Sequence, residues 1–224
     1  MRFIAALVVL VGCSSSPSTR PLVDEACLPA GEAPQTIADA VERINALPKP
    51  VTLPCFLASL PRPLDIVATE SIFSAQPSLD RDHPRMFLFT GGLVMSIVLG
   101  GDGGHLLEFG EWTSDTRSIK GEIPFPVTTE LDGSAPYEIL FEDRELTTCA
   151  FCHAAEDPVE GLDGAFVSDA LRPRQRDLVS LERMEAVHEF CDPEVEPEVC
   201  LMLHALFDFG EVRETRFDLR IATF

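Results

Sequence analysis

The feature that most constrains the fold of this chain is a pair of apolar runs joined by a glycine-rich segment. Residues Leu93–Leu99 form the first run and His105–Phe109 the second, and Gly100–Gly104 lies between them. Apolar and β-branched residues favour strands, whereas glycine and aspartate adopt the backbone conformations that reverse the chain between antiparallel strands. The sequence therefore predicts a β-hairpin over these residues.

Other runs of the same kind extend this pattern in both directions. Arg85–Phe89 precedes the hairpin, Ser118–Phe125 follows it, and Tyr137–Phe141 follows the turn Leu131–Ser134. We expect strand and turn from about Leu53 to Leu146. Successive strands with short turns favour an antiparallel sandwich or meander, and strands do not alternate with long helices as a parallel sheet requires.

Helical patterns flank this region. Apolar residues recur at helical spacing over Gln35–Leu47, with Thr36 as the expected N-cap, and again over Leu178–Phe190 and Glu198–Phe207. The alternating end of the chain, Arg216–Phe224, could form a last strand that pairs back onto the sheet. These patterns predict an α+β fold, with a short helix and a β-rich domain over residues 35–148 and a small helical segment over residues 149–224.

The second segment begins with a motif that carries chemistry, Cys149-Ala150-Phe151-Cys152-His153. Two thiols at this spacing can bond the two vinyl groups of one porphyrin, and the next histidine can bind its iron. The motif resembles the haem-attachment sequence of c-type cytochromes. The resemblance implies haem c as cofactor, thioether bonds at Cys149 and Cys152, and His153 as the proximal ligand. In ordinary small c-type domains the motif follows an N-terminal helix, whereas here it follows a β-rich region, so we do not expect a standard cytochrome c fold.

A second axial ligand would come from the helical segment. Its methionine and histidine side chains are the candidates, namely Met184, His188, Met202 and His204. Methionine would favour a higher reduction potential and a second histidine a lower one. Each residue also has an ordinary interpretation, because methionine commonly fills cores and a helical histidine is commonly hydrogen-bonded within the fold.

The N-terminus predicts export. Arg2 precedes an apolar run that is too short to cross a bilayer as a permanent helix, as in a secretory signal. Leu10-Val11-Gly12-Cys13 resembles the lipobox of bacterial lipoproteins. The resemblance implies a signal peptide over residues 1–12, lipid (palmitate among its chains) on Cys13, and a tether over residues 13–34. Ser14 resembles the outer-membrane sorting residue, so we expect a lipid-anchored protein of the cell envelope, at the outer membrane and facing the periplasm or the cell surface. A plain secreted protein cut nearby is the alternative.

Export constrains the cysteines. Once Cys13 carries lipid, six of the seven cysteines remain, and thiols in an oxidising compartment are expected to be paired or otherwise consumed. Local spacing suggests the disulfides Cys27–Cys55 and Cys191–Cys200, although six cysteines allow about fifteen pairings. This assignment leaves Cys149 and Cys152 together, which is what haem attachment needs.

Charge restricts the partners. The formal net charge is -20, and most of the few basic residues are arginine. Nucleic-acid binding is therefore excluded, and an anionic membrane would repel the domain, so attachment must depend on the lipid. The acidity could attract a basic redox partner or serve only as a solvated surface.

Taken together, these features predict a membrane-tethered extracytoplasmic lipoprotein that binds one covalent haem for electron transfer or redox sensing. No nucleophile motif indicates a hydrolase, so a carrier or binding protein is favoured over an enzyme. Three alternatives stay open: a thiol–disulfide enzyme, a zinc site using Cys149, Cys152, His153 and a distant ligand, and a non-haem binding module in which Cys149–Cys152 is a structural disulfide.

Overall fold

The computed structural model describes residues 23–138, 147–153 and 155–224. The expected signal peptide, the expected lipidation of Cys13 and the first part of the expected tether lie outside these residues. Within the described ranges, no helix is both long enough and apolar enough to cross a membrane.

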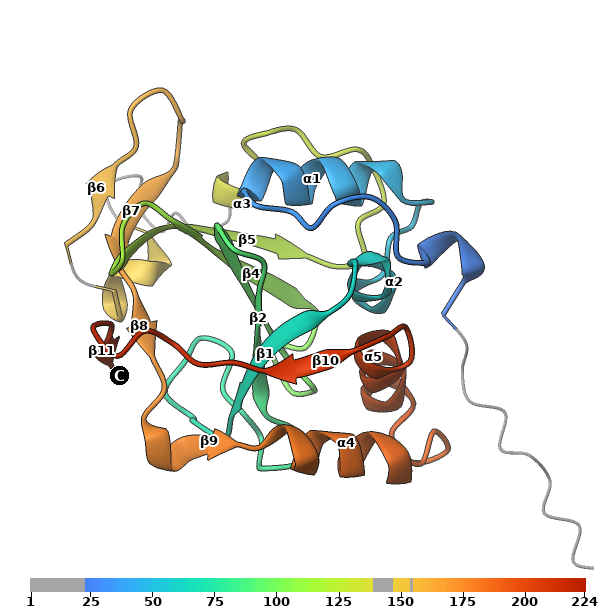
Figure 1. Cartoon of the computed structure of the whole chain (residues 1–224). Helices are drawn as coiled ribbons and strands as arrows, with labels where there is room; N and C mark the ends of the chain where they lie inside the picture. Colours follow the sequence, from blue (N-terminus) through green and yellow to red (C-terminus); the bar gives the residue numbers. More distant parts are fainter. Residues whose placement is uncertain (1–22, 139–146, 154) are drawn as a thin grey trace, which may run out of the picture.

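A large twisted sheet forms the centre of the fold (Figure 1). Within the described residues it has nine strands, β1 (Leu64–Thr69), β2 (Arg85–Phe89), β3 (Leu93–Val98), β4 (Leu106–Trp112), β5 (Arg117–Pro124), β6 (Asp157–Pro158), β7 (Phe166–Asp169), β9 (Leu178–Val179) and β10 (Val212–Glu214). The spatial order is β10-β1-β2-β3-β4-β5-β7-β6, with β9 pairing β1 beside this path. Strands β1 to β5 are consecutive antiparallel neighbours, which confirms the predicted α+β class with an antiparallel, β-rich sheet.

The described helices are α1 (Ile37–Ala46), α2 (Leu53–Ser59), α3 (Ala135–Glu138), α4 (Leu181–Phe190) and α5 (Pro197–Phe207). Three short 3-10 turns accompany them, η1 (Glu25–Cys27), η2 (Thr148–Phe151) and η3 (Gln175–Asp177). Figure 1 shows α1, α2 and α5 on one side of the sheet, and β8 (Leu171–Arg172) and β11 (Ala222–Thr223) on the other, where these two strands form a small parallel sheet.

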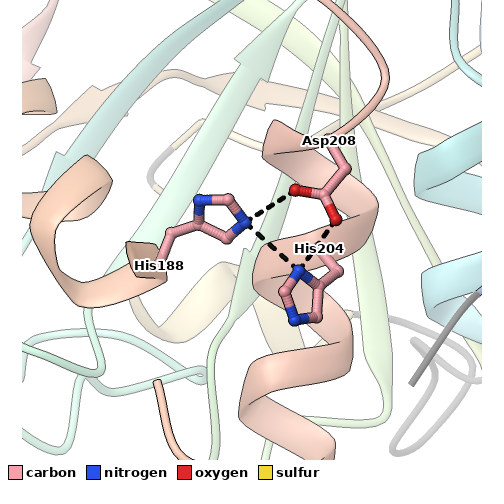
Figure 2. A group of neighbouring side chains, drawn as sticks. All are labelled: His188, His204 and Asp208. Carbon is pink, nitrogen blue, oxygen red and sulfur yellow. Dashed lines mark hydrogen bonds and ion pairs between the residues drawn. The ribbon is translucent and has the colours of Figure 1, made fainter. Parts of the chain in front are cut away.

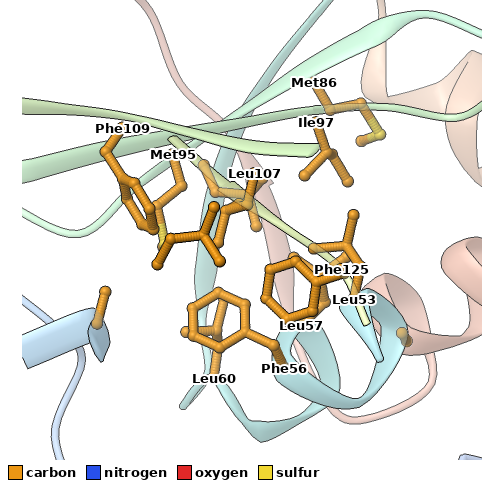
Figure 3. Close-up of a cluster of buried hydrophobic side chains, with 14 of the residues drawn as sticks. Leu53, Phe56, Leu57, Leu60, Met86, Met95, Ile97, Leu107, Phe109 and Phe125 are labelled. Carbon is orange, nitrogen blue, oxygen red and sulfur yellow. The ribbon is translucent and has the colours of Figure 1, made fainter. Parts of the chain in front are cut away.

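The apolar core lies between the sheet and these helices (Figure 3). Helix α2 and its C-cap residue contribute buried side chains to it, among them Leu53, Phe56, Leu57 and, at the cap, Leu60. The facing strands contribute every second residue, including Met86, Met95, Ile97 and Leu107. Because side chains alternate between the faces of a strand, the intervening residues of β2 to β5 are directed to the opposite face.

Local signals explain the first helix and the links between elements. The Thr36 hydroxyl accepts from the Asp39 backbone N–H at 3.0 Å, and the Asp39 carboxylate accepts from the Thr36 N–H at 3.0 Å, so the predicted N-cap is confirmed as a capping box. The disulfides Cys27–Cys55 and Cys191–Cys200 are both present, as the cysteine spacing suggested. The first ties η1 to α2 and the second closes the loop between α4 and α5.

The expectation of strand and turn from Leu53 onward was wrong at its beginning, because Leu53–Ser59 is helix α2. The Thr52 hydroxyl caps this helix by accepting from the Cys55 N–H at 3.3 Å, and Pro54 lies in the first turn, where its missing N–H costs nothing. Nearly every residue of α2 is buried. A helix that is apolar all round shows no amphipathic period, so the pattern did not reveal it.

Predictions near the ends of two other elements were also wrong. Tyr137, predicted to begin a strand, belongs to the short helix α3. The Asp132 carboxylate accepts from the N–H groups of Ser134 and Ala135 and so starts a helical turn. Residues 139–141 of the predicted strand lie outside the described residues. The helix predicted from Leu178 begins at Leu181, because Leu178–Val179 pairs with β1 as β9.

The chain terminus differs from the prediction as well. Of the expected strand Arg216–Phe224, only Ala222–Thr223 is extended and paired, and it joins β8 rather than the large sheet. The Phe217 ring instead packs edge-on against Phe87 and Phe89, at 5.0 and 4.9 Å between ring centroids. The segment that does return to the large sheet is the preceding β10, which runs parallel to β1.

Candidate functional site

The face of the sheet opposite the core carries a row of polar side chains. Arg85, Ser96, Glu108, Lys120 and Glu122 come from four neighbouring strands, β2 to β5, and occupy the alternate positions that do not enter the core. Glu108 lies opposite Ser96 on one side and opposite Glu122 on the other. A sheet face with this many charges needs either solvent or partners for them.

This face borders a cavity of about 780 Å³, a size typical of small-molecule and cofactor sites. The chain around the motif borders the same cavity, since Cys149, Cys152 and His153 all contribute to its lining. Most of the remaining lining is apolar, with aromatic rings from several elements, among them Phe73, Phe87, Trp112, Phe217 and Phe224. The cavity is therefore bounded by the motif, a polar sheet face and aromatic side chains.

The motif itself is held in a compact turn. The Thr147 hydroxyl accepts from the Cys149 N–H at 3.1 Å, and the Thr147 N–H donates to the Glu156 carboxylate at 3.1 Å. The N–H groups of Cys152 and His153 donate to the Cys149 carbonyl at 3.1 and 2.8 Å. Both thiols of the motif are unpaired, with Cys149 half-buried and Cys152 exposed. The turn thus presents two thiols and an imidazole at the same cavity.

The imidazole of His153 has a defined orientation. Its Nδ1 atom lies 2.7 Å from the backbone carbonyl oxygen of Asp169, at the end of β7. Because a carbonyl can only accept, Nδ1 carries the proton and donates, which leaves Nε2 as the nitrogen with the lone pair. Burial lowers the pKa of His153 to about 4, so the ring is neutral at pH 7. Metal-binding histidines are oriented in the same manner, by a hydrogen bond from the second nitrogen.

The charged groups of the cavity are strongly affected by burial. Arg85 forms an ion pair with Glu108 and donates to the Ser96 hydroxyl at 2.8 Å. Lys120 is only 8% exposed; its amine donates to the Ser118 hydroxyl at 2.6 Å, and burial lowers its pKa to about 8. An ammonium in this position would be stabilised by a negatively charged group in the cavity.

Two acidic groups of the cavity have raised pKa values, in contrast to the lowered pKa of Lys120. Burial, followed by the repulsion from Glu108, raises the pKa of Glu122 to about 7. Burial also raises the pKa of the Cys149 thiol to about 11. A thiol–disulfide enzyme needs a thiolate with a lowered pKa, so the surroundings of Cys149 do not favour that alternative.

The four candidate distal ligands lie elsewhere in the described chain, and none of them lines this cavity. Met184 is fully buried in the core, and Met202 lines a second, smaller cavity of about 430 Å³. His188 and His204 face each other and Asp208 between α4 and α5 (Figure 2). The distal ligand therefore stays a prediction.

Comparisons add no assignment: no protein-family model, no curated protein and no solved structure matches this chain. The fold and site define an α+β protein with an antiparallel meander, one face of which borders a cofactor-sized cavity.

Proposed function

We propose that this protein is a membrane-tethered extracytoplasmic lipoprotein that carries one covalent c-type haem and works in electron transfer or redox sensing. Cys149 and Cys152 would form the thioether bonds and His153 would be the proximal ligand. The observation that carries the proposal is that all three side chains border one cavity of about 780 Å³, while Nδ1 of His153 is engaged by a backbone carbonyl.

The described residues fit such a group. A porphyrin is a large apolar plate with two carboxylate groups, and the cavity combines aromatic walls with the cationic side chains of Arg85 and Lys120. The neutral imidazole of His153 keeps its Nε2 lone pair available for iron. Bound haem would supply a one-electron redox centre, and the residues around it would orient it and limit its contact with water.

The setting of the motif supports a haem segment of unusual architecture. The motif follows the five-stranded meander rather than an N-terminal helix, and the chain after it adds β6 and β7 to the edge of the same sheet before α4 and α5 form. We therefore propose a haem-binding segment that is built into the same sheet as the meander, and not a standard cytochrome c fold.

We also propose where the protein is located in the cell envelope. Lipid on Cys13 would hold the domain at the outer membrane, and the net charge of -20 would favour a basic redox partner over an anionic surface. Export would also bring the motif to the compartment where bacteria attach c-type haem.

A second candidate, a non-haem binding module, is favoured by one observation, the buried amine of Lys120 at an apolar cavity. Such a site could hold a small apolar carboxylate, with a structural disulfide at Cys149–Cys152. Both thiols are unpaired in the present structure.

Spectroscopy separates the two functions. The full chain, produced with a haem-attachment system, should show a Soret band that survives acid–acetone extraction. The variant Cys149→Ser/Cys152→Ser should lose the extraction-resistant band, whereas the control Cys191→Ser/Cys200→Ser, which removes two other cysteines, should keep it. Wild-type protein whose Soret band is absent, or is fully extracted, would exclude covalent haem and leave the binding module.

A further inference from the structure

A group of side chains that could bind a metal ion lies between α4 and α5, apart from the cavity beside Cys149 (Figure 2). His188 comes from the last turn of α4, His204 comes from α5, and Asp208 is the C-cap residue of α5. His204 and Asp208 are four residues apart and therefore share one face of the helix, in line with Cys200 one turn earlier. Because Cys200 is bonded to Cys191, the disulfide holds the two helices together near the cluster.

The potential ligand atoms of these side chains converge. Nε2 of His188 lies 3.2 Å from Nδ1 of His204 and 2.8 Å from Oδ1 of Asp208, and Nδ1 of His204 lies 2.9 Å from Oδ2 of Asp208. The side chain of His204 is 4% exposed and that of Asp208 is 33% exposed. The cluster is thus buried on its histidine side and open to solvent through the carboxylate.

Only the protons on the two facing histidine nitrogens can serve the contacts printed among these three side chains. With Asp208 ionised, the three contacts share at most two protons, one on each facing histidine nitrogen. If both nitrogens are protonated and donate to Asp208, the 3.2 Å contact between them has two N–H groups side by side. If either nitrogen is unprotonated, its lone pair faces the carboxylate. A cation at the centre of the triangle would take the place of these protons and be bound by three lone pairs, one from each side chain.

We propose that His188, His204 and Asp208 form a binding site for one divalent transition-metal ion of the Zn²⁺ class. Two imidazole nitrogens and a carboxylate are a ligand set found for zinc in enzymes, where water takes the fourth position. Tetrahedral zinc with bonds of about 2.0–2.1 Å separates its ligand atoms by about 3.3 Å. The observed separations of 2.8 to 3.2 Å reach this value with side-chain movements of a few tenths of an ångström.

This site goes beyond the proposed haem function and does not depend on it, but it would remove His188 and His204 from the candidates for the distal haem ligand. None of its three residues lines the cavity beside Cys149. A bound ion would link α4 to α5 across their packed faces, in addition to the disulfide. Because an ion that binds only the folded state stabilises it, the metal should raise the unfolding temperature.

The test uses the full mature chain with Cys149→Ser and Cys152→Ser, so that neither the motif thiols nor haem contributes. Titration with Co²⁺ should give visible d–d bands that saturate at one equivalent without thiolate charge-transfer bands, and Zn²⁺ should displace them. His188→Gln and Asp208→Asn should each weaken binding at least tenfold. The matched control is His83→Gln, because His83 also lies between carboxylates, Asp80 at 2.9 Å and Glu196 at 3.1 Å, but outside the cluster; it should bind as before.

Thermal unfolding is a second measurement, which can be interpreted even if a substitution destabilises the fold. Zn²⁺ should raise the unfolding temperature of the parent and of His83→Gln, and should raise it much less in His188→Gln. A parent chain that shows no saturable Co²⁺ bands and no Zn²⁺-dependent stabilisation would overturn the proposal. Equal affinity of His188→Gln and His83→Gln would overturn it too, because it would show that the ion binds elsewhere.

Discussion

Glu122 is the side chain whose replacement should change the pH dependence of folding in a defined way. It lies on β5, opposite Glu108 on β4, and both carboxylates face the cavity. Burial raises the pKa of Glu122 from its ordinary value of 4.5 to about 7, and the nearby charge of Glu108 adds to the effect. The perturbation is Glu122→Gln, which keeps the shape of the side chain and removes its charge.

The direction in which stability changes with pH follows from proton linkage. Between pH 4.5 and 7 the folded state holds a proton at Glu122 that the unfolded state has lost, so wild-type stability falls as the pH rises through this window. A pKa difference of one unit corresponds to about 1.4 kcal/mol, so the raised pKa of Glu122 lowers the free energy of unfolding by about 3 kcal/mol. The partial exposure of the side chain reduces this loss to about 2 kcal/mol. Above pH 7 Glu122 is ionised in the folded state, and the full loss of stability caused by burying its charge is present.

The assay is urea unfolding of wild type and Glu122→Gln at intervals from pH 4.5 to pH 8. The variant should gain about 2 to 3 kcal/mol relative to wild type across this range, with most of the gain between pH 5 and 7. Glu42→Gln, the same chemical change at an exposed position of α1, serves as the control and should show no such trend. A constant difference between wild type and Glu122→Gln over the whole range would refute the reasoning.

Two further predictions concern the core and the cross-links. Phe56 is fully buried between α2 and the sheet, so Phe56→Ala should lower the free energy of unfolding by about 3 to 5 kcal/mol in denaturant titrations; a loss below 1 kcal/mol would contradict the packing described. The disulfide Cys27–Cys55 spans 28 residues, and Cys27→Ser/Cys55→Ser should cost about 3 to 4 kcal/mol in the same assay, whereas an unchanged midpoint would show that the bond does not constrain the unfolded chain.

The parts of the fold that the sequence predicted are those with a strong local pattern. The hairpin of β3 and β4 was predictable because β-favouring runs flank four glycines, and α1 was predictable from its period and its cap. Helix α2 was missed because burial on all sides removes the amphipathic period. Strand β10 was missed because three residues carry no pattern, and its partner β1 lies about 150 residues earlier in the chain.

The site was predictable only where the chemistry is contiguous in sequence. Cys149, Cys152 and His153 form one short motif, and the structure places all three at one cavity. Lys120 and Glu122 were missed, although their alternation with the apolar residues of β5 was a readable signal of a second, polar face. The meeting of His188 with Asp208 depends on how α4 packs on α5, which no local pattern encodes.

The proposed function depends above all on covalent bonds between haem and the thiols of Cys149 and Cys152. The most direct test is the mass of the proteolytic peptide that contains both cysteines, taken from full-length protein made with a haem-attachment system. We predict that this peptide carries the added mass of one haem and that its haem absorption remains after denaturation. A peptide with the mass of the plain sequence, or of a Cys149–Cys152 disulfide, would contradict the account.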